Sequence, residues 1–244
     1  MSIIGNEDRN SMNLWHLQQC PLFKNLRGDD LDAVFTAAKL TSFGPGEPVV
    51  NPKEVNEGKP IWLVKRGHVK LGFVDDQGRE STVMILSPGD LFGAFPHATV
   101  ENYGEQSHTL TSACLCSFSQ ADFDKLLRKF PTVAYEVHKA AFRRIEKLQV
   151  RMADLLMKPI EERLAITLLQ LNRQIGEDDG SGGRLFSLPL SHRDLANLVG
   201  SSREMVTHVL RRFRADGLIE SGRKELRLKN LDLLEKLARG EQLN

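Results

Sequence analysis

Residues 200–219, GSSREMVTHVLRRFRADGLI, carry two stripes of opposite character along one predicted helix. The apolar stripe consists of Val206, Val209, Leu210 and Phe213, and the polar stripe of Arg203, Glu204, Thr207, His208 and Arg211. At 3.6 residues per turn each set gathers on one side, so the first set can be buried while the second faces outward. A solvated surface helix has the same pattern, so the stripes alone do not assign a role.

The segment just upstream, LSHRDLANLVG, supplies a second helix and a turn. Ser191 is placed to cap a helix that has Asp194 in its first turn. Ala196 is small enough to let two helices approach, and Gly200, four positions on, suits the turn between them. This spacing predicts a helix-turn-helix.

The second helix of such a motif enters the DNA major groove with its N-terminal part. There Arg203 can bond a guanine through two hydrogen bonds and Glu204 can accept one from a cytosine amine. The further arginines at 211, 212 and 214 suit phosphate contacts better than base reading. The candidate DNA-binding residues are Ser202, Arg203, Glu204, Thr207, His208, Arg211, Arg193, Arg223 and Lys224.

The segment LIESGRKELRLKN after Gly217 predicts a short hairpin with Gly222, Arg223 and Lys224 at its turn. A hairpin wing on the DNA backbone and a basic surface hairpin both fit. Residues 188–230 contain nine Lys or Arg and five Asp or Glu, although the whole chain of 244 residues has a net charge of only +1. This local excess of positive charge points to nucleic acid.

The N-terminal part of the chain has a different texture. A helical pattern from about Asn13 to Leu40 is broken by Pro21 and by a turn at residues 27–30. Short apolar or alternating runs divided by Gly and Pro follow from Thr41 to Phe118, which predicts an antiparallel sandwich or barrel. In DDQGRE, Gly78 can take the positive φ that a hairpin turn needs.

Helical spacing returns at Gln120 and continues after Pro131 to about Met157. A heptad stripe runs along this helix through Ala134, His138, Ala141, Ile145, Leu148, Met152 and Leu155. The stripe predicts either a seam with a second helix or one amphipathic helix packed on its own β domain. Pro159 ends it, a further helix covers Ile160 to Ile175, and Gly176 to Arg184 has the composition of a loop.

Cysteine usage and hydropathy indicate a cytoplasmic protein that is not associated with a membrane. Three cysteines make no disulfide framework and are too few for a four-thiolate iron-sulfur cluster. No apolar run approaches the roughly 18 residues that a membrane span requires, and no signal sequence is recognisable at the N-terminus.

From about Trp15 to Leu237 the chain resembles the CRP/FNR transcription regulators. LSHRDLANLVGSSREMVTHVLRRFRADGLIE is similar to their helix-turn-helix, and PIWLVKRGHVKLGFVDDQGRESTVMILSPGDLFG to their cyclic-nucleotide-binding-type β-roll. The resemblance implies an α+β fold with a β-roll or jelly-roll sensor (13–130), a dimerisation helix (131–158) and a winged helix-turn-helix (159–244). It also implies a homodimer on a pseudo-palindromic operator, with RNA polymerase as a further candidate partner.

The resemblance implies roles for single residues, with departures. Arg203 and Glu204 match the base-reading pair of the family. His208 replaces a second arginine, so the base preferred at the corresponding operator position is not specified by the resemblance. The dimer interface is expected at Ala141, Ile145, Leu148, Met152 and Leu155. The candidate effector pocket comprises Gly93, Ala94, His97, Ser107, His108, Leu148 and Gln149.

The pocket departs most from relatives that bind cyclic AMP. Ala94 replaces their ribose-binding glutamate, and Ser107-His108 stand in place of their phosphate-binding Arg-Ser pair. Without that arginine a cyclic phosphate loses its main charge partner, so we expect another small-molecule effector or none. Leu148-Gln149 replace two hydroxyl residues. We expect them to lie where the sensor domain meets the dimer interface and to transmit the effect of ligand binding between the two.

Three alternatives remain open at this point. Some relatives ligate haem in this domain, which makes His97 an axial-ligand candidate, with Cys114, Cys116, His68, His108 and His138 as candidates for the second ligand. A cupin-type metal enzyme and a β domain used only for oligomerisation are rival classes. The scattered histidines argue against the first rival, and the intact polar stripe argues against the second.

Overall fold

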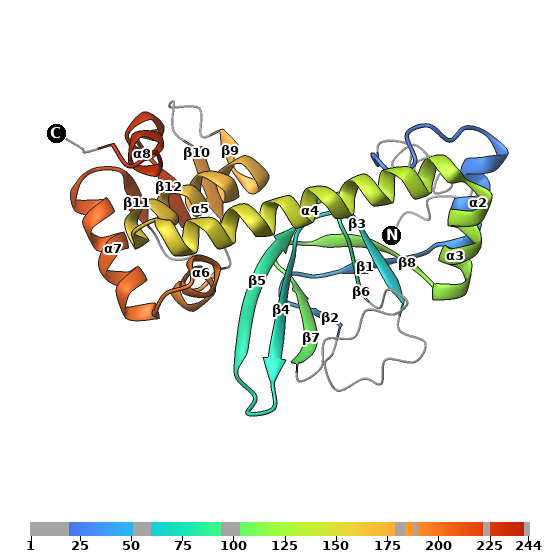
Figure 1. Ribbon diagram of the computed structural model, residues 1–244, viewed down its shortest axis with the longest axis horizontal. Helices are drawn as coiled ribbons and strands as arrows, with labels where there is room; N and C mark the ends of the chain where they lie inside the picture. The colour runs from blue at the N-terminus through green and yellow to red at the C-terminus, as the bar shows by residue number, and fades with distance from the viewer. Residues whose placement is uncertain are drawn as a thin grey trace, which may run out of the picture. The chain divides into compact units, whose positions relative to one another are not determined.

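The computed structural model describes residues 20–50, 60–93, 103–178, 184–187, 190–221 and 225–241. They form two compact units. The first is drawn from Met1–Glu80 and Ile85–Ile145, and the second from Ser81–Met84 and Glu146–Asn244. Each unit is described by itself below, with the element labels of Figure 1.

The first unit is built around two antiparallel four-stranded sheets. One sheet has the order β1-β8-β3-β6, with strands Lys39–Phe43, Ala113–Phe118, Ile61–Arg66 and Leu91–Gly93. The other has the order β2-β7-β4-β5, with strands Pro48–Val50, Tyr103–Thr109, Val69–Asp75 and Glu80–Leu86. Apart from β4 and β5, which a short turn joins, neighbouring strands are far apart in the chain, as the pairing of Leu40 with Cys116 illustrates. The predicted antiparallel β domain is confirmed.

The expected turn between β4 and β5 is confirmed in its geometry. Gly78 has a φ of 75°, which glycine adopts without steric cost. The Asp75 carboxylate accepts hydrogen bonds from the backbone N–H groups of Gln77 and Arg79 at 3.0 and 2.9 Å. The bonds hold the pKa of Asp75 below its ordinary value, the one from the Arg79 N–H contributing most.

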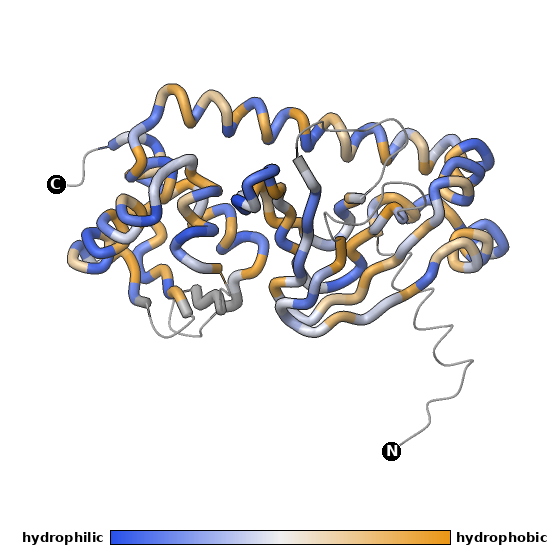
Figure 2. Tube along the Cα trace, turned by 90° about the horizontal axis from the view of Figure 1, so that it is seen from below, coloured by the Kyte–Doolittle hydropathy of each residue, from blue (hydrophilic) through white to orange (hydrophobic). Residues whose placement is uncertain are grey.

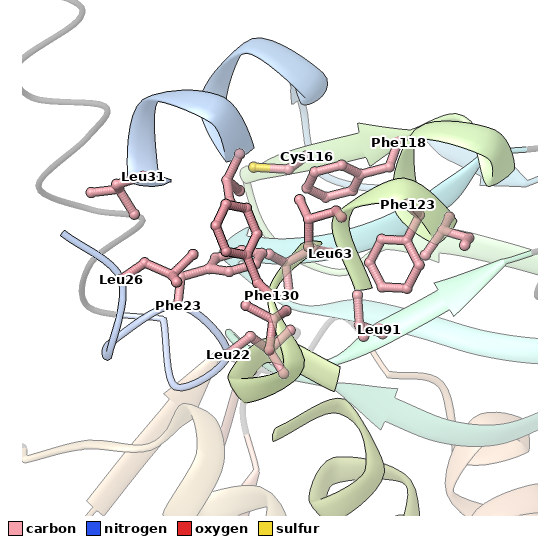
Figure 3. Close-up of a cluster of buried hydrophobic side chains, with 14 residues drawn as sticks. Leu22, Phe23, Leu26, Leu31, Leu63, Leu91, Cys116, Phe118, Phe123 and Phe130 are labelled. Atoms are coloured by element: carbon pink, nitrogen blue, oxygen red, sulfur yellow. The ribbon is translucent and has the colours of Figure 1, made fainter. Parts of the chain in front are cut away.

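Two helices close one end of this unit's core. Helix α2 (Asp29–Ala37) follows Gly28, and α3 (Gln120–Lys129) begins after Ser119, whose side chain accepts from the backbone N–H of Asp122. Figure 3 shows side chains from these segments converging with those of β3, β6 and β8. The cluster contains Leu22, Phe23, Leu26, Leu31, Leu63, Leu91, Cys116, Phe118, Phe123 and Phe130, among others.

One expectation for the start of the chain is wrong. The helical pattern was expected to reach Leu40, but α2 ends at Ala37 and Leu40 lies in β1. The expected turn at residues 27–30 is also shorter, because Asp29 and Asp30 already form the first turn of α2. Pairing with β8, more than seventy residues on, decides the strand, and no local pattern contains that partner.

Helix α4 (Pro131–Met157) is continuous over 27 residues, as predicted. Its first turns bury Val133 in the core of the first unit, and Val137 and Ala140 pack against that core. From Ala141 onward the apolar side chains are exposed, and Figure 2 shows hydrophobic positions recurring among hydrophilic ones along the helix. Packing on its own β domain therefore accounts only for the beginning of the helix.

The second unit combines helices with a small sheet. The helices are α5 (Ile160–Ile175), α6 (His192–Val199), α7 (Arg203–Ala215) and α8 (Leu231–Ala238). The sheet has the order β11-β12-β10-β9, with strands Ile219–Ser221, Glu225–Leu228, Arg184–Ser187 and Glu177–Asp178. Residues 176–184 were expected to be loop, so β9 and the start of β10 correct that expectation. β9 pairs with β10, and β10 pairs with β12.

Four residues of β5, Ser81–Met84, belong to this second unit. The Thr82 hydroxyl donates to Asp194 Oδ1 at 2.7 Å, and both residues are buried. The Arg151 guanidinium of α4 donates to the backbone oxygen of Val83 and, at 3.0 Å, to that of Asn197 near the end of α6. These contacts connect β5, α4 and α6 within one unit.

No helix in the described part of the chain is long and apolar enough to cross a membrane.

Candidate nucleic-acid interface

The first helix of the predicted motif begins and ends where the sequence indicates. The Ser191 side chain accepts from the Asp194 backbone N–H, and the Asp194 carboxylate accepts from the Ser191 backbone N–H at 2.9 Å, forming a capping box. At the other end Gly200 has a φ of 62°, and the N–H of Ser201 donates to the carbonyl of Ala196 at 2.9 Å. This is a glycine-terminated helix end with its last carbonyls satisfied.

The second helix, α7, begins after Ser202, whose hydroxyl accepts from the Met205 backbone N–H at 3.1 Å. Its apolar stripe is buried, as predicted, and comprises Val206, Val209, Leu210 and Phe213. Ala196 is buried on α6, which fits the expectation that a small residue lets the two helices approach. The two helices and the turn at Gly200 therefore form the predicted helix-turn-helix.

Most of the polar stripe of α7 is exposed. Exposed residues are Arg203, Glu204, His208 and Arg211, together with Arg193 on α6 and the capping Ser202. Thr207 differs, because it is half-buried and its hydroxyl donates to the carbonyl of Arg203 at 2.8 Å. Its hydroxyl also meets His192 Nδ1 at 2.8 Å.

The arginines at the end of α7 are not equivalent. Arg212 donates to Glu161 Oε1 of α5 at 3.1 Å, so an ion pair within the second unit holds it. The expectation that Arg212 contacts phosphate stays a prediction, and in the free protein this arginine has an acidic partner. The helical period places the side chains of Arg211 and Arg212 about 100° apart, and the sequence does not show which one meets an acidic partner.

The predicted hairpin is confirmed by the antiparallel pairing of β11 with β12. Its turn residues Gly222, Arg223 and Lys224 lie outside the described residues. On the hairpin itself Glu220 bonds Lys229 at 2.8 Å, and this contact lowers the pKa of the Glu220 carboxyl. Lys229 therefore has an acidic partner within the hairpin.

Sequence reasoning missed two residues at this surface. His192 opens α6, and the residue as a whole is exposed. Partial burial of its ring is the largest cause that lowers its pKa, and the nearby cations Arg203, Arg214 and Arg211 of α7 lower it further. Met205 is 47% exposed in the first turn of α7, whereas the other exposed large hydrophobic residues in the described part of the chain lie on α4. The sequence offered one indication of this exposure: Met205 lies between a residue of the polar stripe, Glu204, and a residue of the apolar stripe, Val206.

The candidate effector residues are only partly described. Gly93 ends β6 with a φ of 96°, while Ala94 and His97 lie outside the described residues. Ser107 is fully buried in β7, and its hydroxyl has no hydrogen-bond partner within the described residues, whereas His108 is half-buried. Leu148 and Gln149 are exposed on α4. The structure thus places Ser107 and His108 on one strand and the two α4 residues on a different element.

The described candidate haem ligands differ in their burial, and His97 lies outside the described residues. Cys116 is fully buried in the core cluster, and burial raises the pKa of its thiol to about 12, which disfavours the thiolate that a metal binds. His138 is exposed on α4, while Cys114 and His68 are half-buried. Within the described residues no group of three His, Cys, Asp or Glu side chains is arranged to hold a metal ion.

All five residues expected at the dimer interface are exposed in the single chain. They are Ala141, Ile145, Leu148, Met152 and Leu155. The exposed fractions of the four larger side chains range from 38% for Leu155 to 62% for Met152. Within the described part of the chain most of this apolar stripe is therefore open to solvent, although the Leu155 side chain lies beside Gly200.

The fold and this surface define a DNA-binding protein with a separate double-sheet domain. Residues 162–237 match the model of the Crp-like helix-turn-helix domain, and residues 40–130 match that of the cyclic nucleotide-binding domain. The chain is a member of the CRP/FNR family of transcription regulators. It is thus a sequence-specific DNA-binding regulator, and a homodimer is typical of the family.

Individual relatives share the whole architecture at low identity. The chain is 28% identical over 223 residues to the cyclic AMP receptor protein of Thermus thermophilus, covering 90% of this chain and 97% of the relative. It is 26% identical to the probable transcriptional regulator flp of Lacticaseibacillus casei, covering 89% and 95%. The solved structure of the c-di-GMP responsive regulator CLP from Xanthomonas campestris shares its fold, with a TM-score of 0.70 at 21% identity and coverage of 83% and 99%.

Proposed function

We propose that this regulator binds a pseudo-palindromic operator as a two-fold dimer, with one α7 helix in each of two successive major grooves about 34 Å apart. The observation that carries the proposal is the division of α7 into a fully buried apolar stripe and an exposed polar stripe. Because the buried stripe anchors the helix to its unit, the exposed residues of the first turn are free to enter the groove.

Base reading is assigned to Arg203 and Glu204. Both are exposed in the first turn of α7, directly after the cap at Ser202. The arginine fork matches the two acceptors of guanine, and the carboxylate accepts from a cytosine amine. His208, one turn further along, reads a base acceptor or a phosphate with a single hydrogen bond.

Phosphate contacts are assigned to residues around these two. Arg193 and Arg211 are exposed on α6 and α7, and the Ser202 hydroxyl is exposed at the start of α7. Arg223 and Lys224 at the hairpin turn complete the set as a wing. Such contacts fix the register of the protein on the duplex and make its affinity depend on salt.

The dimer is assigned to the exposed stripe of α4. Side chains 141, 145, 148, 152 and 155 alternate at spacings of four and three, so they lie along one side of the helix. Two copies of this stripe bury each other, which removes apolar surface from water without disturbing the packing of Val133 on its own core.

The first unit is assigned the role of a sensor for a small molecule other than cyclic AMP. Ser107 offers a buried hydroxyl with no partner within the described residues, and buried polar groups are normally satisfied. A cyclic phosphate needs a cation in addition, and Ser107-His108 supply no arginine. Any effector acts by favouring one arrangement of the two α7 helices over another.

The test is selection of bound sequences from random duplex DNA by the purified full-length protein, with its visible spectrum recorded. We expect enrichment of a pseudo-palindrome. Arg203→Ala should weaken binding to the best operator by about 1–3 kcal/mol and relax preference at one base pair of each half-site.

Arg212→Ala is the matched control, because it removes the same charge from the same helix at a side chain paired with Glu161. It should leave the preferred sequence unchanged. An unaltered preference in Arg203→Ala would refute the assigned docking. A Soret band in the purified protein would show that the sensor holds haem.

A further inference from the structure

His192 and Thr207 form a hydrogen bond between the two helices of the DNA-binding motif. His192 Nδ1 lies 2.8 Å from Thr207 Oγ1, and the Thr207 hydroxyl donates its own proton to the carbonyl of Arg203 at 2.8 Å. Since a hydroxyl has one proton, it can only accept from the imidazole. Nδ1 therefore keeps its proton, and His192 gains or loses a proton at Nε2.

The charges around the ring are mostly positive. Arg203, Arg214 and Arg211 of α7 lower the pKa of His192, adding to the effect of its burial, which is the largest cause. On its own helix the charged neighbours are Arg193 and Asp194, and the Asp194 carboxylate already bonds Ser191 and Thr82. In the free protein the imidazole is consequently held neutral more firmly than an ordinary histidine.

We propose that His192 takes up a proton when α7 docks on DNA and then donates from Nε2 to a backbone phosphate, which makes operator affinity depend on pH. The proposal rests on the docking assigned above. Phosphates neutralise the arginines that oppose the charge of the imidazolium and add an anion beside it. Docking thus reverses the sign of the field at the ring, and the proton comes from the solvent.

The direction of the pH dependence follows from the two states. The pKa of His192 is lowered in the free protein and raised in the complex, so binding consumes a proton at any pH between these values. Affinity therefore rises as pH falls toward the pKa of His192 in the free protein. The contribution of His192 protonation to affinity is lost as pH rises through the pKa of the complex. Each unit of difference corresponds to about tenfold in affinity per copy, or about a hundredfold for a dimer.

The experiment measures the affinity of the full-length protein for its selected duplex by fluorescence anisotropy, at fixed ionic strength, between about pH 6 and pH 8. We expect the affinity of the wild type to fall at least tenfold across this range. His192→Asn should remove the larger part of that fall, because the amide can still donate to Thr207 but has no group that titrates. His138→Asn is the control, since it removes an exposed histidine of the first unit to which no DNA contact is assigned, and it should retain the pH dependence.

Titration of the His192 ring proton by NMR, with and without the duplex, separates the possible failures. We expect a higher pKa in the complex. If the protein binds selectively but this pKa does not rise, or if His192→Asn keeps the full pH dependence, the inference is wrong while the proposed docking stands. If no duplex is bound selectively at any pH, the docking itself is wrong and the inference falls with it.

Discussion

Replacing Thr82 by valine tests how the second unit holds the first helix of its DNA-binding motif. The Thr82 hydroxyl donates to Asp194 Oδ1 at 2.7 Å, and the two residues are only 5% and 9% exposed. Valine has nearly the volume of threonine but lacks the hydroxyl, so it removes one donor from a buried carboxylate. Hydrogen bonds to charged groups contribute about 1.5–3 kcal/mol, and we therefore expect α6 to lose about 2 kcal/mol of local stability.

Amide hydrogen exchange along α6 measures this loss, because a chain of two units need not unfold in one step. A change of about 2 kcal/mol corresponds to roughly thirtyfold faster exchange under conditions where reclosing is fast and exchange follows the equilibrium of local opening. Thr82→Ser keeps the hydroxyl and should exchange nearly as slowly as the wild type. Unchanged α6 protection in Thr82→Val would refute the reasoning.

Three further outcomes are expected. Leu148→Glu, which places a charge in the α4 seam, should dissociate the dimer in sedimentation equilibrium, whereas Val150→Glu, on the opposite side of the helix, should not. Replacing one operator thymine by uracil should cost the wild type about 1 kcal/mol and Met205→Ala nothing, because we expect the proposed docking to bring the exposed Met205 against a thymine methyl. At about pH 8 a thiol reagent should modify half-buried Cys114 in the native protein, but Cys116, whose pKa burial raises to about 12, only after unfolding. A monomeric Val150→Glu, a uracil penalty that persists in Met205→Ala, or rapid native labelling of Cys116 would contradict them.

Much of the DNA-binding motif was predictable because its determinants are local. Ser191, Asp194 and Gly200 satisfy or terminate a helix through contacts within a few residues, and the structure shows those contacts. The buried stripe of α7 follows from the 3.6-residue period alone. The hairpin turn at Gly78 is local in the same sense.

The errors concern contacts between residues that are distant in the chain. Leu40 lies in a strand because β8 pairs with it, and Arg184 begins β10 because β12 pairs with it. The ion pair of Arg212 with Glu161, which is fifty-one residues away, is a further contact that no local pattern shows. The residues next to a given position in the sequence do not indicate such distant partners.

Spacing, caps and glycine conformations act over one or two turns, so the residues alone predicted the helix-turn-helix, the long helix α4 with its apolar stripe and the antiparallel type of the N-terminal strands, but not the bounds of each strand. Tertiary structure alone decided which polar side chains are engaged. It joined His192 to Thr207, Thr82 to Asp194 and Arg212 to Glu161. Each of these bonds requires two segments to be brought together by burial of apolar surface elsewhere, and only the folded chain specifies which polar groups then face each other.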